Sequence, residues 1–290
     1  MELVKLGEKT YYIKNPVNIG VYKVSENGVI IVDAGNDKDA GKKILKIIDE
    51  QGWSVEGIIA THSNADHIGG CKFIQERTNC TVYAFGIEGD FTQHTLLEPS
   101  FLYGGYPFKD LKNKFLMAQP VNVTDISIGL PDGLEYFELK GHFFDMIGIK
   151  TDDDVYFIAD SVFGEETVTK YHLFFVYDVK EYLNTLEKLE QLNGYMCVPS
   201  HFEPTCNILS AIALNRSKIK EICENILKIC KDRITFDDIL KNLFDVYALR
   251  MNSGQYVLVG STVRSYLSYL YDDGKLNFEF TDNKMYWYTV

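Results

Sequence analysis

The sequence predicts an α/β protein in which a sandwich of two β-sheets is covered by helices and followed by a smaller C-terminal module. Three observations support this fold class. Strand-like and helix-like segments alternate through the first two-thirds of the chain. A long aromatic segment, residues 86–124, interrupts this alternation, and beyond His201 the pattern changes to helices followed by two short strands. We therefore predict a first domain of residues 1–212 and a second of residues 213–290.

The elements of the first half follow from hydrophobic runs and their end signals. "GVIIVDAG" is a short apolar run that ends at Asp33 and Gly35, which is typical of a buried strand. "NDKDAGKKILKIIDEQG" places its isoleucines on one face and stops at Gly52, which predicts a helix. "VEGIIATH" and "CTVYAF" predict two more strands, with a helix over "DHIGGCKFIQERTN" between them.

Residues 86–124 are too long for an ordinary connection, and their aromatic residues lie among glycines and prolines. We expect this insertion to form a lid or a pocket wall, with Tyr103 and Tyr106 as candidate substrate contacts. Strands resume in "LEYFELKGH", and "DMIGIKT" and "DVYFIADS" are joined at a polar turn that indicates a hairpin. "VKEYLNTLEKLEQLNG" predicts an amphipathic helix, and "YMCVPSH" predicts one more short strand.

The C-terminal segment predicts a linking helix over "RSKIKEICENILKICKD", then two helices and two short strands that turn at Asp282 and Asn283. Helices closed by such a hairpin have the outline of a winged helix. Residues 233–290 contain six Lys and Arg against seven Asp and Glu, whereas a winged helix that binds DNA should be basic. We expect this module to pack against the first domain or against a second copy, in a possible homodimer.

Composition excludes several classes of partner and location. The formal charge of −12 over 290 residues argues against a nucleic acid held by its phosphates. We expect no contact with a membrane, because no apolar run approaches the length of a membrane span, and the first residues contain no signal-peptide core. The six cysteines form no C-x-x-C pair, so reduced thiols and a cytoplasmic location are expected.

The segment "THSNADHIGG" contains the densest group of candidate ligands. His62, Asp66 and His67 follow a predicted strand directly, and imidazoles with a carboxylate are a ligand set that suits zinc or iron. The remaining ligands should lie at later strand ends. The candidates that follow apolar strand-like runs are His142, Asp160 and His201, and Asp33 also lies at a strand end.

"HSNADH" resembles the H-x-H-x-D-H motif of the metallo-β-lactamase superfamily, and the resemblance extends in chain order over roughly residues 1–210. It implies an αββα sandwich with a pair of metal ions at one edge. By position, the first metal would be held by His62, residue 64 and His142, the second by Asp66, His67 and His201, and both would be bridged by Asp160.

Asn64 stands where the motif has its second histidine, and an amide oxygen is a weaker ligand for zinc than an imidazole. Three readings follow. Asn64 coordinates through its oxygen, or the first site fills only at high metal concentration or with substrate present, or a metal is held by His62, His142 and Asp160 alone. The last set is the two-histidine, one-carboxylate ligation of non-haem iron oxygenases.

The leading interpretation is a hydrolase of a small ester, thioester, lactone or amide that uses a water activated by one or two zinc ions. Asp66 would bind metal and orient this water, and Asp33 would either support a ligand histidine or act as a strand-end turn residue. The alternatives are a mononuclear iron dioxygenase and a degenerate metal-binding or regulatory module. His94 and His172 are expected to be surface or packing residues. A nuclease is disfavoured by the acidic chain, and a true β-lactamase by the missing export signal.

Overall fold

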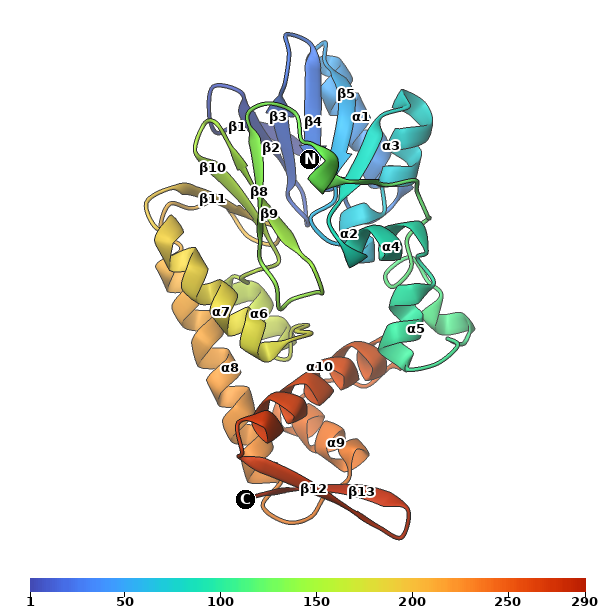
Figure 1. Ribbon diagram of the computed structural model, residues 1–290, viewed down its shortest axis with the longest axis vertical. Helices are drawn as coiled ribbons and strands as arrows, with labels where there is room; N and C mark the ends of the chain where they lie inside the picture. Colours follow the sequence, from blue (N-terminus) through green and yellow to red (C-terminus); the bar gives the residue numbers. More distant parts are fainter.

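The computed structural model describes all 290 residues and is an αββα sandwich followed by a C-terminal helical region (Figure 1). The first sheet contains, in spatial order, β1 (Glu2–Lys5), β2 (Thr10–Lys14), β3 (Ile19–Lys23), β4 (Gly28–Val32), β5 (Ser54–Ile59), β6 (Thr81–Ala84) and β7 (Thr124–Asp125). The second contains β11 (Met196–Pro199), β10 (Val155–Ala159), β9 (Ile147–Thr151) and β8 (Leu134–Glu138). The predicted sandwich is therefore confirmed.

The helices follow the predicted alternation. Those of the sandwich are α1 (Lys38–Glu50), α2 (Ala65–Ile68), α3 (Cys71–Thr78), α4 (Ile87–Gln93), α5 (Leu97–Tyr103), α6 (Glu165–Tyr171) and α7 (Val179–Leu189). Three short 3-10 helices are η1 (Lys109–Leu111), η2 (Ile126–Ile128) and η3 (Glu190–Leu192). α1 begins where Asp37 accepts hydrogen bonds from the backbone N–H groups of Asp39 and Ala40.

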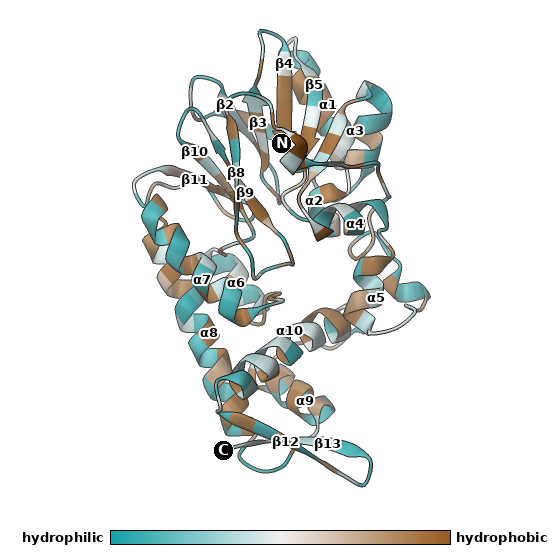
Figure 2. Ribbon diagram, viewed as in Figure 1, coloured by the Kyte–Doolittle hydropathy of each residue, from teal (hydrophilic) through white to brown (hydrophobic).

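Three apolar layers hold the sandwich together. The outer face of the first sheet packs on α1 and α3, with Ile31, Ile44 and Ile58 fully buried between them. The space between the two sheets is filled by a second cluster that includes Ile30 and Phe157. Strand β4, in the middle of the first sheet, is almost wholly hydrophobic (Figure 2), as expected for a strand buried on both faces. The third layer lies between the second sheet, α7 and the helices that follow.

The aromatic insertion at residues 86–124 is folded and not a free flap. Phe91 lies 5.3 Å from both Phe143 and Phe144 between ring centroids, so α4 is anchored on the loop after β8. Farther along, Leu102, Leu111 and Leu116 form a small core with Val257 of the C-terminal region. The insertion therefore connects the sandwich to the C-terminal region.

The C-terminal region contains α8 (Leu209–Ile229), α9 (Phe236–Val246), α10 (Ser253–Asp272) and the antiparallel hairpin of β12 (Leu276–Thr281) and β13 (Lys284–Thr289). That this region is a winged helix remains a prediction. The predicted boundary after residue 212 falls inside α8, and one apolar cluster includes both α7 and α10. α10 begins beside α5 and ends at the hairpin (Figure 1). None of these helices combines the length and hydrophobicity that a membrane crossing requires.

Candidate metal centre

The predicted ligands converge because they follow strands that end at the same edge of the sandwich. Asp33 comes directly after β4, Asp160 directly after β10, and His201 shortly after β11. His62 lies just beyond β5, and His142 lies in the loop after β8. The prediction that these strand ends meet is confirmed by the contacts between their side chains.

The loop after β5 is held against the neighbouring loop after β4. It turns into α2, which carries Asp66 and His67, and then passes through Gly69 and Gly70. A Cβ atom at Gly70 would collide with the carbonyl oxygen of Ala34, and one at Gly69 would collide with the backbone of Asn36. The two glycines therefore permit the close approach that aims α2 at the other strand ends.

His62 and His67 are oriented by the partners of their Nδ1 atoms. The Nδ1 atom of His67 lies 2.8 Å from Oδ2 of buried Asp33, which also accepts a hydrogen bond from the N–H of Thr61. The hydroxyl of Thr61 bonds the same carboxylate and lies 3.1 Å from Nδ1 of His62. Since the Thr61 hydroxyl donates to Asp33, its oxygen accepts the Nδ1 proton of His62, and both histidines turn Nε2 towards the centre.

His142 and His201 are fixed in the same way by backbone carbonyls. Nδ1 of His142 lies 3.0 Å from the carbonyl oxygen of Phe175, and Nδ1 of His201 lies 3.1 Å from that of Pro16. A carbonyl oxygen only accepts, so in both rings Nδ1 carries the proton. All four predicted histidines thus turn Nε2 towards one place, the orientation that metal ligands need.

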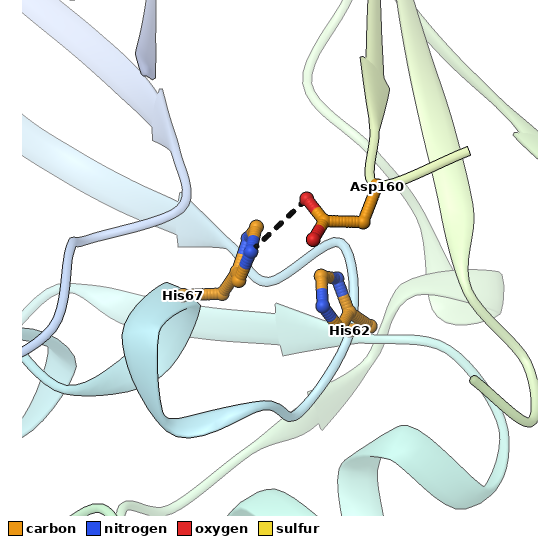
Figure 3. A group of neighbouring side chains, drawn as sticks. All are labelled: His62, His67 and Asp160. Carbon is orange, nitrogen blue, oxygen red and sulfur yellow. Dashed lines mark ion pairs between the residues drawn. The ribbon is translucent and has the colours of Figure 1, made fainter. Parts of the chain in front are cut away.

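The donor set fits a metal centre. Two groups of three donor atoms each lie within 4.8 Å of one another, namely His62, His67 and Asp160, and Asp66, His67 and His201. In the first group, Nε2 of both histidines and Oδ1 of Asp160 are buried and make no hydrogen bond. The one ion pair among these atoms joins Nε2 of His67 and Oδ1 of Asp160 at 3.3 Å (Figure 3). Buried polar atoms normally make hydrogen bonds, so three neighbouring ligand atoms that make none indicate a site for a cation.

The charges of the centre divide it into two halves. Burial opposes ionisation of Asp160, but His201 and His67 outweigh it and hold the pKa of Asp160 well below its usual value. Burial also opposes protonation of His67, yet Asp160 and Asp33 raise its pKa well above the ordinary value. The pKa of His201 is raised to about 8 because Asp160 outweighs its burial. Burial lowers the pKa of both His62 and His142.

Asn64 faces the centre and is held by a residue that the sequence did not single out. Its Oδ1 lies 3.1 Å from Nε2 of His142, and its Nδ2 donates to Oε1 of Glu98 at 2.8 Å. Glu98 comes from α5 and is only 5% exposed, and burial raises its pKa well above the ordinary value. Glu98 therefore fixes the amide with its oxygen, the only atom of the group that can bind a metal, towards His142.

Glu88 is a second acid that the sequence analysis missed. Its Oε2 accepts hydrogen bonds from the N–H and the hydroxyl of Ser63, and its Oε1 accepts one from the N–H of Asp145. It is fully buried, and burial raises its pKa to about 7. Since Ser63 lies between His62 and Asn64, Glu88 positions the loop that carries them. An acid at the start of an insertion has no sequence signal that separates this role from a surface position.

A cavity of about 370 Å³ opens onto the predicted ligands. We call it the site cavity, and its lining residues are Asn64, Asp66, Glu98, Phe115, His142, Asp160, Phe163, Thr167, Tyr171, Leu173, Phe174, Phe175, His201, Gln255, Leu258 and Val259. Three of these belong to α10, so the C-terminal region completes the site.

Tyr103 and Tyr106 were predicted as substrate contacts, and this prediction needs correction because neither residue lines the site cavity. Tyr103 faces a separate groove beside Arg264, and Tyr106 is 74% exposed. The insertion reaches the cavity through Glu98 and Phe115 instead. His94 and His172 lie outside the centre as expected, His94 exposed at the end of α4 and His172 stacked on Tyr247.

Solved structures share this fold over the whole chain. A beta-lactamase domain protein from Burkholderia ambifaria is similar with a TM-score of 0.77 and 16% sequence identity, covering 100% of this chain and 94% of that one. A metallo-beta-lactamase family protein from Thermus thermophilus has a TM-score of 0.71 at 16% identity and covers 100% and 98%. A metallo-beta-lactamase from Pontibacter korlensis covers 76% of this chain, with a TM-score of 0.54.

Curated relatives match over a short segment only. The chain is 35% identical over 63 residues to a hydroxyacylglutathione hydrolase from Nitrobacter hamburgensis, which is 20% of this chain and 25% of that protein. It is 39% identical over 51 residues to a hydroxyacylglutathione hydrolase from Rhodopseudomonas palustris and spans 20% of that protein's length. The sequence-family model of the metallo-beta-lactamase superfamily, in contrast, matches residues 13–201 of this chain. The chain therefore belongs to the metallo-beta-lactamase superfamily of metallo-hydrolases.

Proposed function

We propose that this protein is a zinc-dependent hydrolase of a small ester, thioester, lactone or amide. One observation supports this most strongly. Four imidazoles, each with Nδ1 bonded to an acceptor, present Nε2 to a common centre that also contains Asp66 and Asp160. Nitrogen-rich sets with one or two carboxylates are typical of zinc in hydrolases. The family supports the same reaction class, and the short matches to hydroxyacylglutathione hydrolases agree with it.

The residues divide between two metal positions. His62, Asn64 and His142 would hold the first ion, and Asp66, His67 and His201 the second, with Asp160 between them. Asp160 suits this role because its Oδ1 lies 3.3 Å from Nε2 of His67 and its Oδ2 lies 3.7 Å from Nε2 of His142. A bound zinc ion would supply Lewis acidity and lower the pKa of a coordinated water towards about 7.

Asp66 is the best-placed residue for moving a proton. Its carboxylate oxygens lie 3.9 Å from Nε2 of His67 and 3.8 Å from Nε2 of His201, and its side chain is 42% exposed towards the site cavity. It has no hydrogen-bond partner that would occupy it, so it can orient a water molecule and accept a proton from it. Asp33 acts one layer farther out, where its bond to Nδ1 keeps Nε2 of His67 free.

The iron dioxygenase alternative uses fewer residues than the centre provides. It assigns His62, His142 and Asp160 to one iron ion and gives no role to His67 or His201. Yet Nε2 of His67 is buried without a hydrogen-bond partner, and Nε2 of His201 lies 3.0 Å from Asp160 Oδ2. The regulatory alternative gives no reason for the site cavity beside these donors. Both observations favour the hydrolase.

We infer a small-molecule substrate, with no nucleic acid or membrane as partner. The site cavity is small, and the formal charge of −12 disfavours a partner that is held by its phosphates. The cysteines are all free, and four of the six are buried, which supports a reducing location such as the cytoplasm.

Elemental analysis of the purified protein, with a panel of small thioesters, esters, lactones and amides, tests this proposal. We expect zinc to be bound, hydrolysis to stop after chelation, and zinc to restore it. Bound iron with oxygen-dependent turnover would overturn the proposal in favour of the dioxygenase. Tight zinc binding without turnover on any substrate would favour the regulatory module.

A further inference from the structure

The site cavity is acidic at one end. Among its lining residues, the acids are Asp66, Glu98 and Asp160, all of which lie beside the predicted metal positions. No lysine or arginine lines the cavity. Lys114 and Lys170 lie outside the lining, with Nζ 5.3 Å from the ring centroid of Phe115 and 4.9 Å from that of Tyr171. The charged groups that line the cavity itself are therefore the metal centre and acids.

The other end of the cavity is apolar. Leu173 and Phe174, which follow α6, are 3% and 4% exposed, and α10 contributes Leu258 and Val259 to the lining. The polar residues there, Thr167 and Gln255, are uncharged. A carboxylate buried against this wall would lose its hydration without gaining a partner, whereas each methylene buried there is stabilised.

We propose that the site cavity binds the acyl chain of a substrate that is apolar and uncharged beyond its scissile carbonyl. This inference rests on the proposed hydrolase function and specifies its substrate class. The reacting group lies at the metal end, and the chain extends between the apolar segment after α6 and α10. Acyl groups with a terminal carboxylate are poor ligands, and short acyl groups leave the apolar wall unused.

Binding of hydroxamates to the zinc-loaded protein tests the inference without requiring turnover. Acetohydroxamate, hexanohydroxamate and 5-carboxypentanohydroxamate share one metal-binding group, and the last two differ only by a methyl group replaced by a carboxylate. By calorimetry, we expect affinity to rise roughly three- to fourfold for each added methylene that is buried. The carboxylated compound should bind more than about tenfold more weakly than hexanohydroxamate. Equal affinities for these two, or no gain with chain length, would overturn the inference.

Variants on α10 show whether the apolar wall of the site cavity causes the preference for uncharged acyl chains. Leu258→Lys places a cation at the apolar end. It should reduce or reverse the difference in affinity between hexanohydroxamate and 5-carboxypentanohydroxamate. Gln255→Lys lies on the same helix, is only partly buried and is the milder change if Leu258→Lys fails to fold. The matched control is Val246→Lys on α9, which is 55% exposed and does not line the cavity, and it should leave all three affinities unchanged.

Hydrolysis separates this inference from the proposed function. Acetyl, hexanoyl and 5-carboxypentanoyl thioesters of N-acetylcysteamine provide the same series as substrates. If the hydroxamates follow the expected order but none of the thioesters or the corresponding esters, lactones and amides is hydrolysed, the hydrolase proposal fails and the cavity preference stands. If the thioesters are hydrolysed with equal kcat/KM, the hydrolase proposal stands and the cavity preference is wrong.

Discussion

The two predicted metal positions lie side by side but differ in their electrostatics. The second is surrounded by carboxylates, which raise the pKa of His67 and His201, so without a metal this position binds protons. The first combines a neutral amide with His62 and His142, whose pKa values burial lowers. A cation at the second position replaces protons in a preformed negative environment, whereas one at the first relies on neutral donors apart from the shared Asp160. We therefore expect the second position to bind metal more tightly.

Removing two ligands of the second position should have the largest effect. Replacing His67 and His201 together by alanine leaves only Asp66 and the shared Asp160 there. Loss of a single outer-shell partner already weakens metal binding by about 10- to 100-fold, so we expect tight binding to disappear. The measurement is metal content by elemental analysis after dialysis.

The control for the double variant is His94→Ala, because His94 is exposed at the end of α4 and outside the centre. It should keep the metal content of the natural protein. A double variant that retains its full metal content would sink the assignment of the second position.

A change behind the second position should have a smaller effect. Asn in place of Asp33 has one acceptor oxygen for three donors, namely Nδ1 of His67 and the N–H and hydroxyl of Thr61. Its NH2 group cannot accept the Nδ1 proton of His67. We expect Asp33→Asn to weaken the second position by about 10- to 100-fold and to change the first less, as measured by calorimetric titration. The same substitution at exposed Asp39 is the control. Equal losses at Asp33 and Asp39 would show that Asp33 does not support His67.

The difference between predicted and unpredicted residues has a physical cause. Asp33 and Asp160 could be placed because each follows a strand whose apolar pattern marks where it ends, and strands of one sandwich end at a common edge. Glu88, Glu98 and the real walls of the site cavity could not be placed in this way. Their positions depend on how the insertion packs against the loop after β8 and on α10, which are contacts between segments distant in sequence.

The same limit explains the misplaced tyrosines. The aromatic composition of residues 86–124 predicted a wall, but it did not indicate which aromatic residues face inward. Phe91 packs on Phe143, Phe115 reaches the site cavity, and Tyr106 is exposed. Composition identifies an aromatic insertion, whereas the direction of each side chain depends on tertiary packing.

The pH dependence of metal binding should distinguish the two positions. In the metal-free protein His201 has a pKa of about 8, so below that pH a metal must displace its proton. Each proton that the metal displaces should lower the apparent affinity at the second position by about tenfold per pH unit below 8. At the first position, where burial lowers the histidine pKa values, affinity should stay flat above about pH 6.5. Competition titrations with a chromophoric chelator, over roughly pH 6.5 to 9, measure the affinity of each position.

Protonation of His201 should also make the stability of the metal-free protein depend on pH, which provides a second check. The folded-state pKa of His201 lies above its ordinary value of 6.5, so protonation stabilises the metal-free fold below about pH 6.5. This stabilisation is lost as the pH rises through about 8. Identical pH profiles for both metal positions would contradict the proposed division of the centre.

The smallest expected effect concerns Asn64. An imidazole donates more strongly to zinc than an amide oxygen does, so Asn64→His should tighten the first position by up to about tenfold, or about 1.4 kcal/mol, and leave the second unchanged. Asn64→Ala is the matched control, because it removes the amide oxygen without supplying a nitrogen, and it should weaken the first position.

In the natural protein the first ion should leave before the second on mild chelation. Calorimetric titration with parallel elemental analysis measures all three proteins. If the natural protein binds two equivalents with indistinguishable affinity and the histidine variant binds no more tightly, the amide held by Glu98 is a full ligand and the first position is not the weaker one.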